Sequence, residues 1–203
     1  MTRLPLRRNP LQEEQRIRTR ALVTQGALAV FAEHGFLGSS IEQILVRAGV
    51  SRSAFYSQFD GKLAVVCTIA EDFEPEWTPL FDVLADLHDP DMESLTAWAA
   101  IFLDFHRNNL ETCTLLTQVT ALEEKLYWQV LGQRDALIRR LGENHPAFAA
   151  AKHDCNALLE ARLVLGHIDQ ACFHIVRQNL PDPGGHGANI IARNLLGFLQ
   201  GGR

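Results

Sequence analysis

Residues 40–59 read SIEQILVRAGVSRSAFYSQF and contain two short helical patterns that meet across a glycine. Ser40 and Gln43 have the spacing of a capping box, in which each side chain bonds the backbone N–H of the other residue, and Ser51 can cap a second helix. Ala48-Gly49 combines a small residue, suited to closely approaching helices, with the permissive backbone of a turn. The apolar side chains that can pack the two helices together are Ile41, Ile44, Leu45, Val50, Ala54, Phe55 and Phe59. The stretch therefore predicts a helix-turn-helix unit.

Such a unit can read DNA, because its second helix enters the major groove by its N-terminal end. In that position Arg52 and Ser53 face base edges, and the Arg52 guanidinium can bind a guanine with two hydrogen bonds. The residues with groups suited to phosphate or base contacts are Ser40, Arg47, Ser51, Arg52, Ser53, Tyr56 and Lys62. Arg3, Arg7 and Arg8 form a basic N-terminal arm that can add contacts to phosphates or the minor groove. The competing interpretation is a helical hairpin that only packs.

The charge of the chain is unevenly distributed. Residues 1–62 carry nine Lys and Arg against five Asp and Glu, whereas residues 63–203 carry ten against nineteen, within a net charge of −5. A basic head on an acidic body indicates that only the head meets a polyanion such as double-stranded DNA.

Helical periodicity dominates the rest of the sequence, and strand-like alternation is nearly absent. Helices are predicted over about residues 10–34, 40–48, 51–58, 62–80, 91–107, 111–119, 121–141, 154–178 and 188–199, with a short helical segment after Pro146. Asn9 can cap the first helix, and Gly35 can end it in the left-handed conformation. Pro75 and Pro79 predict a kink or a break near Glu74, because proline lacks an N–H donor. The predicted fold class is all-α, with about nine helices and no sheet.

The composition excludes several classes of protein. Hydrophobic residues make up 47% and charged residues 21% of the 203 residues, as in an ordinary globular protein. No apolar run approaches the roughly 18 to 20 residues of a membrane span, and no apolar segment follows the basic start as in a secretory signal. We therefore expect a cytoplasmic protein without membrane contact.

Residue patterns for metal sites and for catalysis are missing as well. No HExxH motif, Cys/His ligand spacing, GxSxG, P-loop or GxGxxG occurs, so we predict no metal, no cofactor and no enzymatic activity. The scattered Cys67, Cys113, Cys155 and Cys172 are expected to be reduced, partly buried thiols, with a redox sensor or a disulfide as the alternatives.

Residues 16–72 resemble the N-terminal domain of TetR-type transcriptional regulators. The matching features are Phe31, Gly35, Ser39-Ser40, Ala48-Gly49-Val50-Ser51, Phe55-Tyr56, Phe59 and Lys62. The resemblance implies an Ω-shaped all-α dimer, with DNA contacts at Ser40, Arg52, Ser53, Tyr56 and Lys62. It also divides the chain into an arm with a helix-turn-helix DNA-binding domain, residues 1–62, and an effector-binding and dimerisation domain, residues 63–203. Leu45 and the run 58–61 depart from the usual family pattern, which bears on helix packing and operator choice.

The second domain has no signature of its own, and its prediction rests on large apolar side chains and on the resemblance. Family members bind effectors inside this helical bundle, and apolar pockets with a few polar anchors are the usual small-molecule sites. The candidate ligand-binding residues are Trp77, Trp98, Phe102, Phe105, His106, Trp128 and Asn156. Core packing is the alternative role for each of the aromatic residues.

The last two long helices are candidates for a dimer surface. The residues of this predicted surface are Leu158, Arg162, Leu165, Gly166, Asp169, Phe173, Ile191, Leu195 and Phe198. The resemblance implies a four-helix interface built from two copies of this helix pair, and packing within one chain is the alternative. A symmetric dimer would present two recognition helices to half-sites about 34 Å apart or wider.

Together these observations predict a TetR-like regulator, most simply a repressor that binds a palindromic operator as a homodimer and is released by a small lipophilic ligand. An activator or a ligand-independent DNA binder on the same fold is the first alternative, and a body without a cavity would favour ligand independence. Another kind of helix-turn-helix protein is a further alternative. An enzyme is the last, and turnover of a substrate without DNA would favour it.

Overall fold

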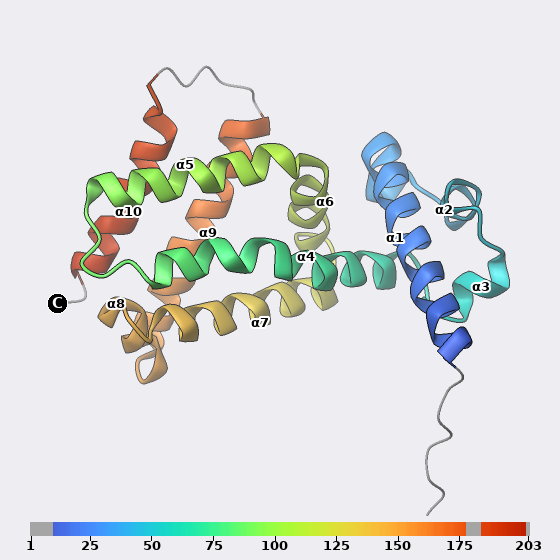
Figure 1. Ribbon diagram of the computed structural model, residues 1–203, viewed down its shortest axis with the longest axis horizontal. Helices are drawn as coiled ribbons and strands as arrows, with labels where there is room; N and C mark the ends of the chain where they lie inside the picture. The colour runs from blue at the N-terminus through green and yellow to red at the C-terminus, as the bar shows by residue number, and fades with distance from the viewer. Residues whose placement is uncertain (1–9, 178–183, 202–203) are drawn as a thin grey trace, which may run out of the picture. The chain divides into compact units, whose positions relative to one another are not determined.

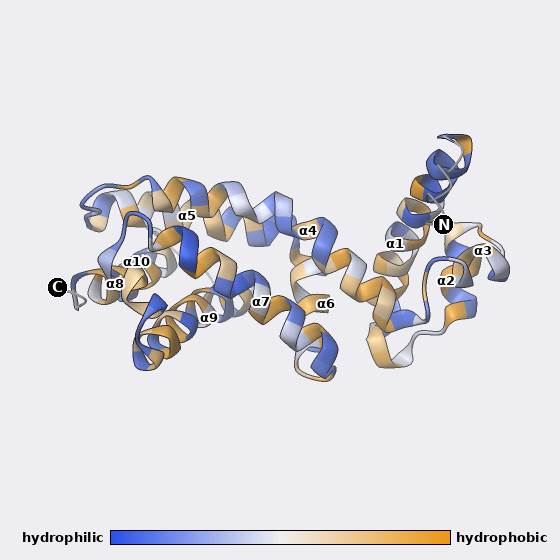
Figure 2. Ribbon diagram, turned by 90° about the horizontal axis from the view of Figure 1, so that it is seen from below, coloured by the Kyte–Doolittle hydropathy of each residue, from blue (hydrophilic) through white to orange (hydrophobic). Residues whose placement is uncertain are grey.

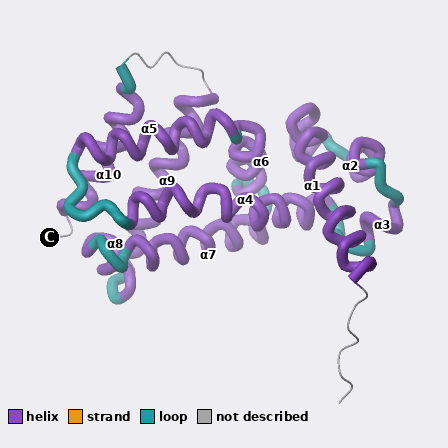
Figure 3. The backbone as a smooth tube through the Cα atoms, in the orientation of Figure 1, coloured by secondary structure: helices purple, strands orange, loops and turns teal. Residues whose placement is uncertain are grey.

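The computed structural model describes residues 10–177 and 184–201, and within these ranges it is entirely helical (Figure 1, Figure 3). The α-helices are α1 (Pro10–Gly38), α2 (Ile41–Ala48), α3 (Arg52–Tyr56), α4 (Lys62–Ala85), α5 (Met92–Asn108), α6 (Leu110–Thr120), α7 (Glu124–Leu141), α8 (Pro146–Ala149), α9 (Cys155–Arg177) and α10 (His186–Gly201), and a 3-10 turn, η1, spans Ala150–Lys152. The ten α-helices of these ranges confirm the all-α prediction, and the short α8 is the segment expected after Pro146. The predicted arm of Arg3, Arg7 and Arg8 and the predicted N-cap Asn9 lie outside the described residues.

Contacts divide the chain into two compact units, with the boundary between Ile69 and Ala70. The boundary falls inside α4, so the first two turns of this helix belong to the N-terminal unit and the remainder to the C-terminal unit. One continuous helix is therefore shared by both units.

The N-terminal unit forms its turns where the sequence predicts them. The Ser40 Oγ accepts a hydrogen bond from the Gln43 N–H at 3.2 Å, and the Gln43 Oε1 accepts one from the Ser40 N–H at 2.7 Å, which completes the capping box of α2. Gly49 follows α2 with φ 65° and ψ 32°, a left-handed conformation that carries little steric cost for glycine. Gly35, with φ 70°, interrupts the helical geometry of α1 at the predicted position, and one more turn follows it.

Helices α1 and α2 approach each other closely at Gly26 and Ala48. A Cβ atom built at Gly26 would lie 3.0 Å from the Ala48 Cβ and 3.0 Å from the Ala48 backbone nitrogen. The small residue at position 48 therefore serves the contact between α1 and α2, whereas the sequence suggested the contact between α2 and α3.

Helix α4 runs without interruption over Lys62–Ala85, so the break that was one of the two outcomes expected near Glu74 does not occur. Pro75 and Pro79 are both exposed and lie one turn apart. The carbonyls that lose their helical N–H partners therefore share an outward side of the helix, where water can bond them. The Thr78 hydroxyl donates to the Glu74 carbonyl at 2.7 Å and adds a bond between the two prolines.

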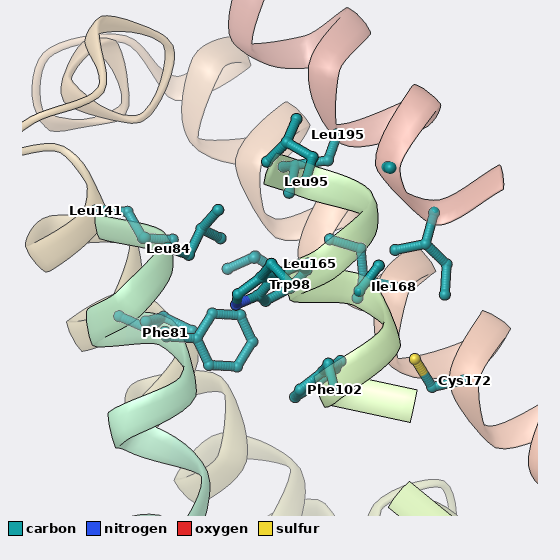
Figure 4. Close-up of a cluster of buried hydrophobic side chains, with 14 of the residues drawn as sticks. Phe81, Leu84, Leu95, Trp98, Phe102, Leu141, Leu165, Ile168, Cys172 and Leu195 are labelled. Atoms are coloured by element: carbon teal, nitrogen blue, oxygen red, sulfur yellow. The ribbon is translucent and has the colours of Figure 1, made fainter. Parts of the chain in front are cut away.

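One hydrophobic core holds the C-terminal unit together, and α5 packs on both α9 and α10. Trp98 and Phe102 stack on α5 with ring centroids 5.3 Å apart, and Phe81 of α4 lies edge-on to both (Figure 4). The Trp98 indole N–H donates to the Leu80 carbonyl at 2.8 Å, which ties α5 to the C-terminal half of α4. This aromatic cluster fixes α4 and α5 relative to each other within the unit.

The helices of the C-terminal unit are amphipathic, and hydrophobic and hydrophilic residues alternate around their ribbons in Figure 2. Among the residues that the structure describes, no helix combines the length and the apolar character that crossing a membrane requires.

Candidate functional site

Helices α2 and α3 form a helix-turn-helix with a small aromatic core. Ile44 and Phe55 are completely buried, and Phe59 is nearly so. The Phe55 ring lies 5.5 Å from the Phe59 ring and 5.3 Å from the Tyr56 ring, which meets it edge-on. Phe55 and Phe59 bury one side of α3, which contacts α1, and the other side of α3 is exposed.

The exposed side of α3 carries four of the residues predicted to contact DNA. We call Ser51, Arg52, Ser53 and Tyr56 the recognition face, because all four are exposed. The Ser51 Oγ accepts a hydrogen bond from the Ala54 N–H at 3.2 Å, so it caps α3 as the sequence predicts. The recognition face presents a guanidinium and several hydroxyls, which can donate hydrogen bonds to base edges and phosphates, and it also presents an aromatic ring.

Two acidic residues of the same unit pair with the predicted DNA-binding arginines. The Arg52 guanidinium pairs with the Glu42 carboxylate, and the Arg47 Nη2 lies 2.6 Å and 2.7 Å from the two carboxylate oxygens of Glu33. The hydrogen bond from Arg47 lowers the pKa of the Glu33 carboxyl. Because all four side chains are exposed, both pairs are weak and a phosphate can compete for either arginine.

Ser40 and Lys62, also predicted to contact DNA, have their polar atoms engaged inside the unit. The Lys62 Nζ donates to the carbonyls of Phe36 at 2.7 Å and Ser39 at 2.6 Å, and it lies 4.9 Å from the centroid of the Phe36 ring. The Ser40 Oγ is the cap of α2. The structure therefore does not bring these two side chains onto the recognition face.

A second candidate site is a cavity of about 730 Å³ inside the C-terminal unit, walled by α4, α5, α6, α7 and α9. Its aromatic lining consists of Phe73, Trp77, Phe81, Phe102, Phe105 and Tyr127. Its polar lining consists of His106, Cys113, Thr117, Thr120, Gln133, Arg134, Arg162, His167, Asp169 and Gln170. A cavity of this volume and composition suits a small lipophilic molecule.

The structure brings four of the predicted ligand-binding residues together in this cavity, namely Trp77, Phe102, Phe105 and His106. It places the other three elsewhere. Trp98 belongs to the buried core, Trp128 is 59% exposed on α7, and Asn156 is exposed at the start of α9.

Sequence reasoning missed the polar wall contributed by Gln133 and Arg134 of α7. No local pattern distinguishes a polar residue beside a cavity from one on a solvated helix face. The signal that was available is the spacing of Phe73, Trp77 and Phe81 along α4, which marks one apolar stripe. A core and a cavity would both use such a stripe.

Two ion pairs join α7 to α9 at the cavity wall. The Arg134 Nη2 lies 2.5 Å from the Asp169 Oδ2. Arg162 binds Asp135 with two hydrogen bonds, Nε to Oδ1 at 2.8 Å and Nη2 to Oδ2 at 2.7 Å. Both arginines of the cavity lining are therefore already bound to carboxylates.

Burial keeps two further polar groups of the cavity lining uncharged near neutral pH. It lowers the pKa of His106 and raises the pKa of Cys113 to about 12. His106 is 7% exposed, and its Nδ1 is buried without a hydrogen-bond partner in the part of the chain that the structure describes.

None of the four cysteines, all of which lie in the described residues, is part of a disulfide; Cys67, Cys113 and Cys172 are buried and Cys155 is exposed. Within the described ranges no cluster of His, Cys, Asp and Glu side chains has the arrangement of a metal site.

The residues predicted to form a dimer surface lie in three environments. Leu165, Ile191 and Leu195 are buried in the core of their own chain and offer no surface to a partner. Arg162, Gly166 and Asp169 line the cavity. Leu158, Phe173 and Phe198 are half-buried. The large exposed hydrophobic side chains of the two helices are Leu159 and Leu163 on α9 and Ile190 on α10.

Comparisons with known proteins agree with this geometry. Residues 23–66 match the family model of the bacterial regulatory proteins of the tetR family. No curated protein matches the sequence significantly.

Several solved structures share the fold. Salmonella enterica GusR is 17% identical over 95% of this chain and 98% of its own, with a TM-score of 0.67. A TetR-like transcriptional regulator from Rhodococcus sp. RHA1 is 16% identical over 88% and 93%, with a TM-score of 0.61. A transcriptional regulator from Aquifex aeolicus VF5 is 20% identical over 88% and 97%, with a TM-score of 0.57.

The family model covers α2, α3 and the start of α4, and therefore the whole recognition face. At identities of this level the solved structures show that the fold is shared along most of the chain. Residues 23–66 therefore match the family of bacterial regulatory proteins named tetR, and the chain as a whole shares the fold of solved transcriptional regulators.

Proposed function

We propose that the protein is a homodimeric repressor that binds a palindromic operator and leaves it when a small lipophilic molecule occupies the cavity. In this proposal the N-terminal domain reads DNA through the recognition face. The C-terminal domain binds the effector and joins the two protomers. The protein would act where the chromosome lies, in the cytoplasm.

The observation that carries the proposal is that different parts of one helix, α4, are bonded to the N-terminal unit and line the cavity. Its first residue, Lys62, is bonded to the backbone just before α2, at Phe36 and Ser39. Farther along, Phe73 and Trp77 of the same helix line the cavity. A ligand that displaces the cavity-lining part of α4 would therefore act on the element to which the helix-turn-helix is fastened.

In thermodynamic terms, release requires that the effector binds the DNA-incompetent conformation more tightly than the DNA-bound one. The coupling free energy is reciprocal, so the operator must weaken effector binding by the same factor. A typical coupling of about 1–3 kcal/mol changes either affinity about 5-fold to 150-fold.

Activation or ligand-independent binding on the same fold is the second candidate. The cavity supports a response to a ligand, and it supports repression and activation equally. We propose no enzymatic activity, because reversible binding of DNA and of a ligand is all that the proposed function requires.

The proposal is tested by selecting genomic fragments with the purified protein and footprinting the selected DNA. Arg52→Ala and Tyr56→Ala serve as matched variants of the recognition face, and the affinity is followed over a salt titration. We expect a protected palindrome that both variants lose and that salt weakens steeply.

Two outcomes would count against the proposal. A footprint without two-fold symmetry would contradict the homodimer. Retention of the full footprint by both variants would show that the recognition face does not read DNA.

A further inference from the structure

The two arginines that line the cavity are paired with carboxylates rather than left free for a ligand. Arg134 is bound to Asp169, and Arg162 is bound to Asp135 in the two-bond geometry that guanidinium and carboxylate groups prefer. The Gln133 amide donates to the Glu74 carboxylate at 2.8 Å. Among the described residues that line the cavity, neither arginine lacks an anionic partner.

This pairing disfavours an anionic ligand. A carboxylate, phosphate or sulfonate entering the cavity would have to take a guanidinium away from its carboxylate, which would leave a half-buried Asp135 or Asp169 without its partner. An uncharged molecule leaves both ion pairs intact and gains from contact with the aromatic lining.

One polar atom of the wall does lack a partner. The Nδ1 of His106 is buried and unbonded within the described part of the chain, and the His106 ring lies edge-on to Phe102 with centroids 4.9 Å apart. A neutral imidazole can both donate and accept a hydrogen bond. The His106 ring lines the cavity, and rotation about its Cβ–Cγ bond would bring an imidazole nitrogen to the hydroxyl, carbonyl or amine of a ligand seated there.

From these contacts we propose that the effector is an uncharged aromatic or lipophilic molecule with one hydrogen-bonding group placed at His106, and not an anion. This inference rests on the proposed effector function of the cavity and names its ligand class. The two ion pairs disfavour binding of an anion, because they occupy the guanidinium groups that an anion would need.

Two fluorescent probes with the same aromatic skeleton test the inference directly. N-phenyl-1-naphthylamine is uncharged, whereas 1-anilinonaphthalene-8-sulfonate adds a sulfonate to that skeleton. Fluorescence titration of the purified full chain should give an affinity for the uncharged probe at least about tenfold higher than for the sulfonate. His106→Phe should weaken the uncharged probe about fivefold, and Trp128→Phe, outside the cavity, should leave it unchanged.

A charge variant supplies the complementary measurement. Asp135→Asn keeps the size of the side chain and frees Arg162 inside the cavity, so sulfonate binding should strengthen about tenfold while the uncharged probe changes less than about twofold. Asp104→Asn is the matched control, because it frees Arg107 in an exposed pair whose residues do not line the cavity.

The outcomes test the ligand class and the effector site separately. Equal affinity of the wild-type protein for the two probes, or no response of the sulfonate to Asp135→Asn, overturns the ligand class while leaving an effector site in place. Failure of both probes to bind overturns the effector site itself, and with it the inference. Operator binding is measured separately by the footprint and is independent of all three results.

Discussion

Lys62 stabilises the fold, although its position in the sequence suggested a contact with a DNA phosphate. It is the first residue of α4, where a phosphate contact is plausible. Its ammonium group is instead half-buried and bonded to two backbone carbonyls beside the Phe36 ring. These carbonyls belong to the last turn of α1 and the residue before the cap of α2. Lys62 therefore fixes the entry to the helix-turn-helix.

Replacement of Lys62 by Met keeps the alkyl chain and removes the ammonium group. We expect the free energy of unfolding to fall by about 1–3 kcal/mol, because two charge-assisted hydrogen bonds are lost. Urea denaturation measures this loss. The slope of operator affinity against salt should stay at the wild-type value, whereas Arg52→Ala should reduce it by about one. A reduced slope for Lys62→Met would assign the ammonium group to a phosphate.

His106 makes stability depend on pH in one direction. Burial, partly opposed by Asp169, holds the folded-state pKa of His106 below its ordinary value of 6.5. As the pH falls through about 6.5, the unfolded chain therefore takes up a proton that the folded chain refuses, so the folded state loses stability until the folded-state pKa is reached.

His106→Phe should remove this contribution. Denaturation at about pH 7.5 and about pH 5.5 should show a larger loss of unfolding free energy for the wild-type protein than for the variant. All other residues are the same in the two proteins, so their contributions cancel in the difference. Equal losses would show that His106 is already charged in the folded chain at the lower pH.

At the scale of helices, two glycines in helical segments have the same helix propensity but differ in the space available for a Cβ atom. An alanine gains about 0.8–1.0 kcal/mol over glycine inside a helix. At Gly26 the new Cβ would meet the backbone of Ala48 at 3.0 Å, and at Gly132 of α7 it would meet nothing within 4 Å.

We therefore expect opposite signs for the two substitutions. Gly26→Ala should destabilise the protein by about 1–3 kcal/mol, because α1 and α2 must move apart. Gly132→Ala should stabilise it by about 0.5–1 kcal/mol. Calorimetric melting of both variants beside the wild-type protein measures the signs, and a stabilised Gly26→Ala would contradict the close approach of the two helices.

The helices themselves were predictable wherever a local signal specified them. The capping box of α2, the Ser51 cap of α3 and the left-handed Gly49 all depend on a few neighbouring residues, and each occurs as expected. Helix α4 was harder, because the outward placement of Pro75 and Pro79 depends on which side of the helix the rest of the unit covers.

The cavity depended even more on tertiary contacts. Phe102 and Trp98 lie one turn apart with similar local sequence, yet only Phe102 lines the cavity while Trp98 is bonded to Leu80 in the core. Arg162 and Asp169 have the spacing of a helix surface, and their partners on α7 are distant in the sequence. Periodicity identifies the apolar stripe of a helix but does not show where the packing leaves space.

At the scale of the whole molecule, the exposed apolar residues of α9 and α10 are where we expect two protomers to meet. Ile190 of α10 is 39% exposed and does not line the cavity, so it tests the surface without touching the proposed effector site. Ile101, on α5, is 53% exposed and provides a matched control.

Ile190→Asp should shift the protein from dimer to monomer in sedimentation velocity at micromolar concentration, because a charge would be buried between the protomers. Ile101→Asp should sediment as the wild-type protein does. Operator affinity should fall together with the dimer, since a monomer reads only one half-site. A dimeric Ile190→Asp would move the interface to another surface.

The pairing of Arg52 with Glu42 and of Arg47 with Glu33 has a consequence for the search for an operator. Every stretch of chromosomal DNA attracts unpaired cations, and the number of such competing stretches reaches about 10⁶–10⁹ per genome. Because both pairs are exposed and weak, the carboxylates lower the attraction of random DNA only slightly, and a sequence that offers the arginines base-edge acceptors in addition to phosphates offsets their release most fully. In the proposed function, fewer protein copies are then needed to keep a single operator occupied, because fewer of them are held elsewhere on the chromosome.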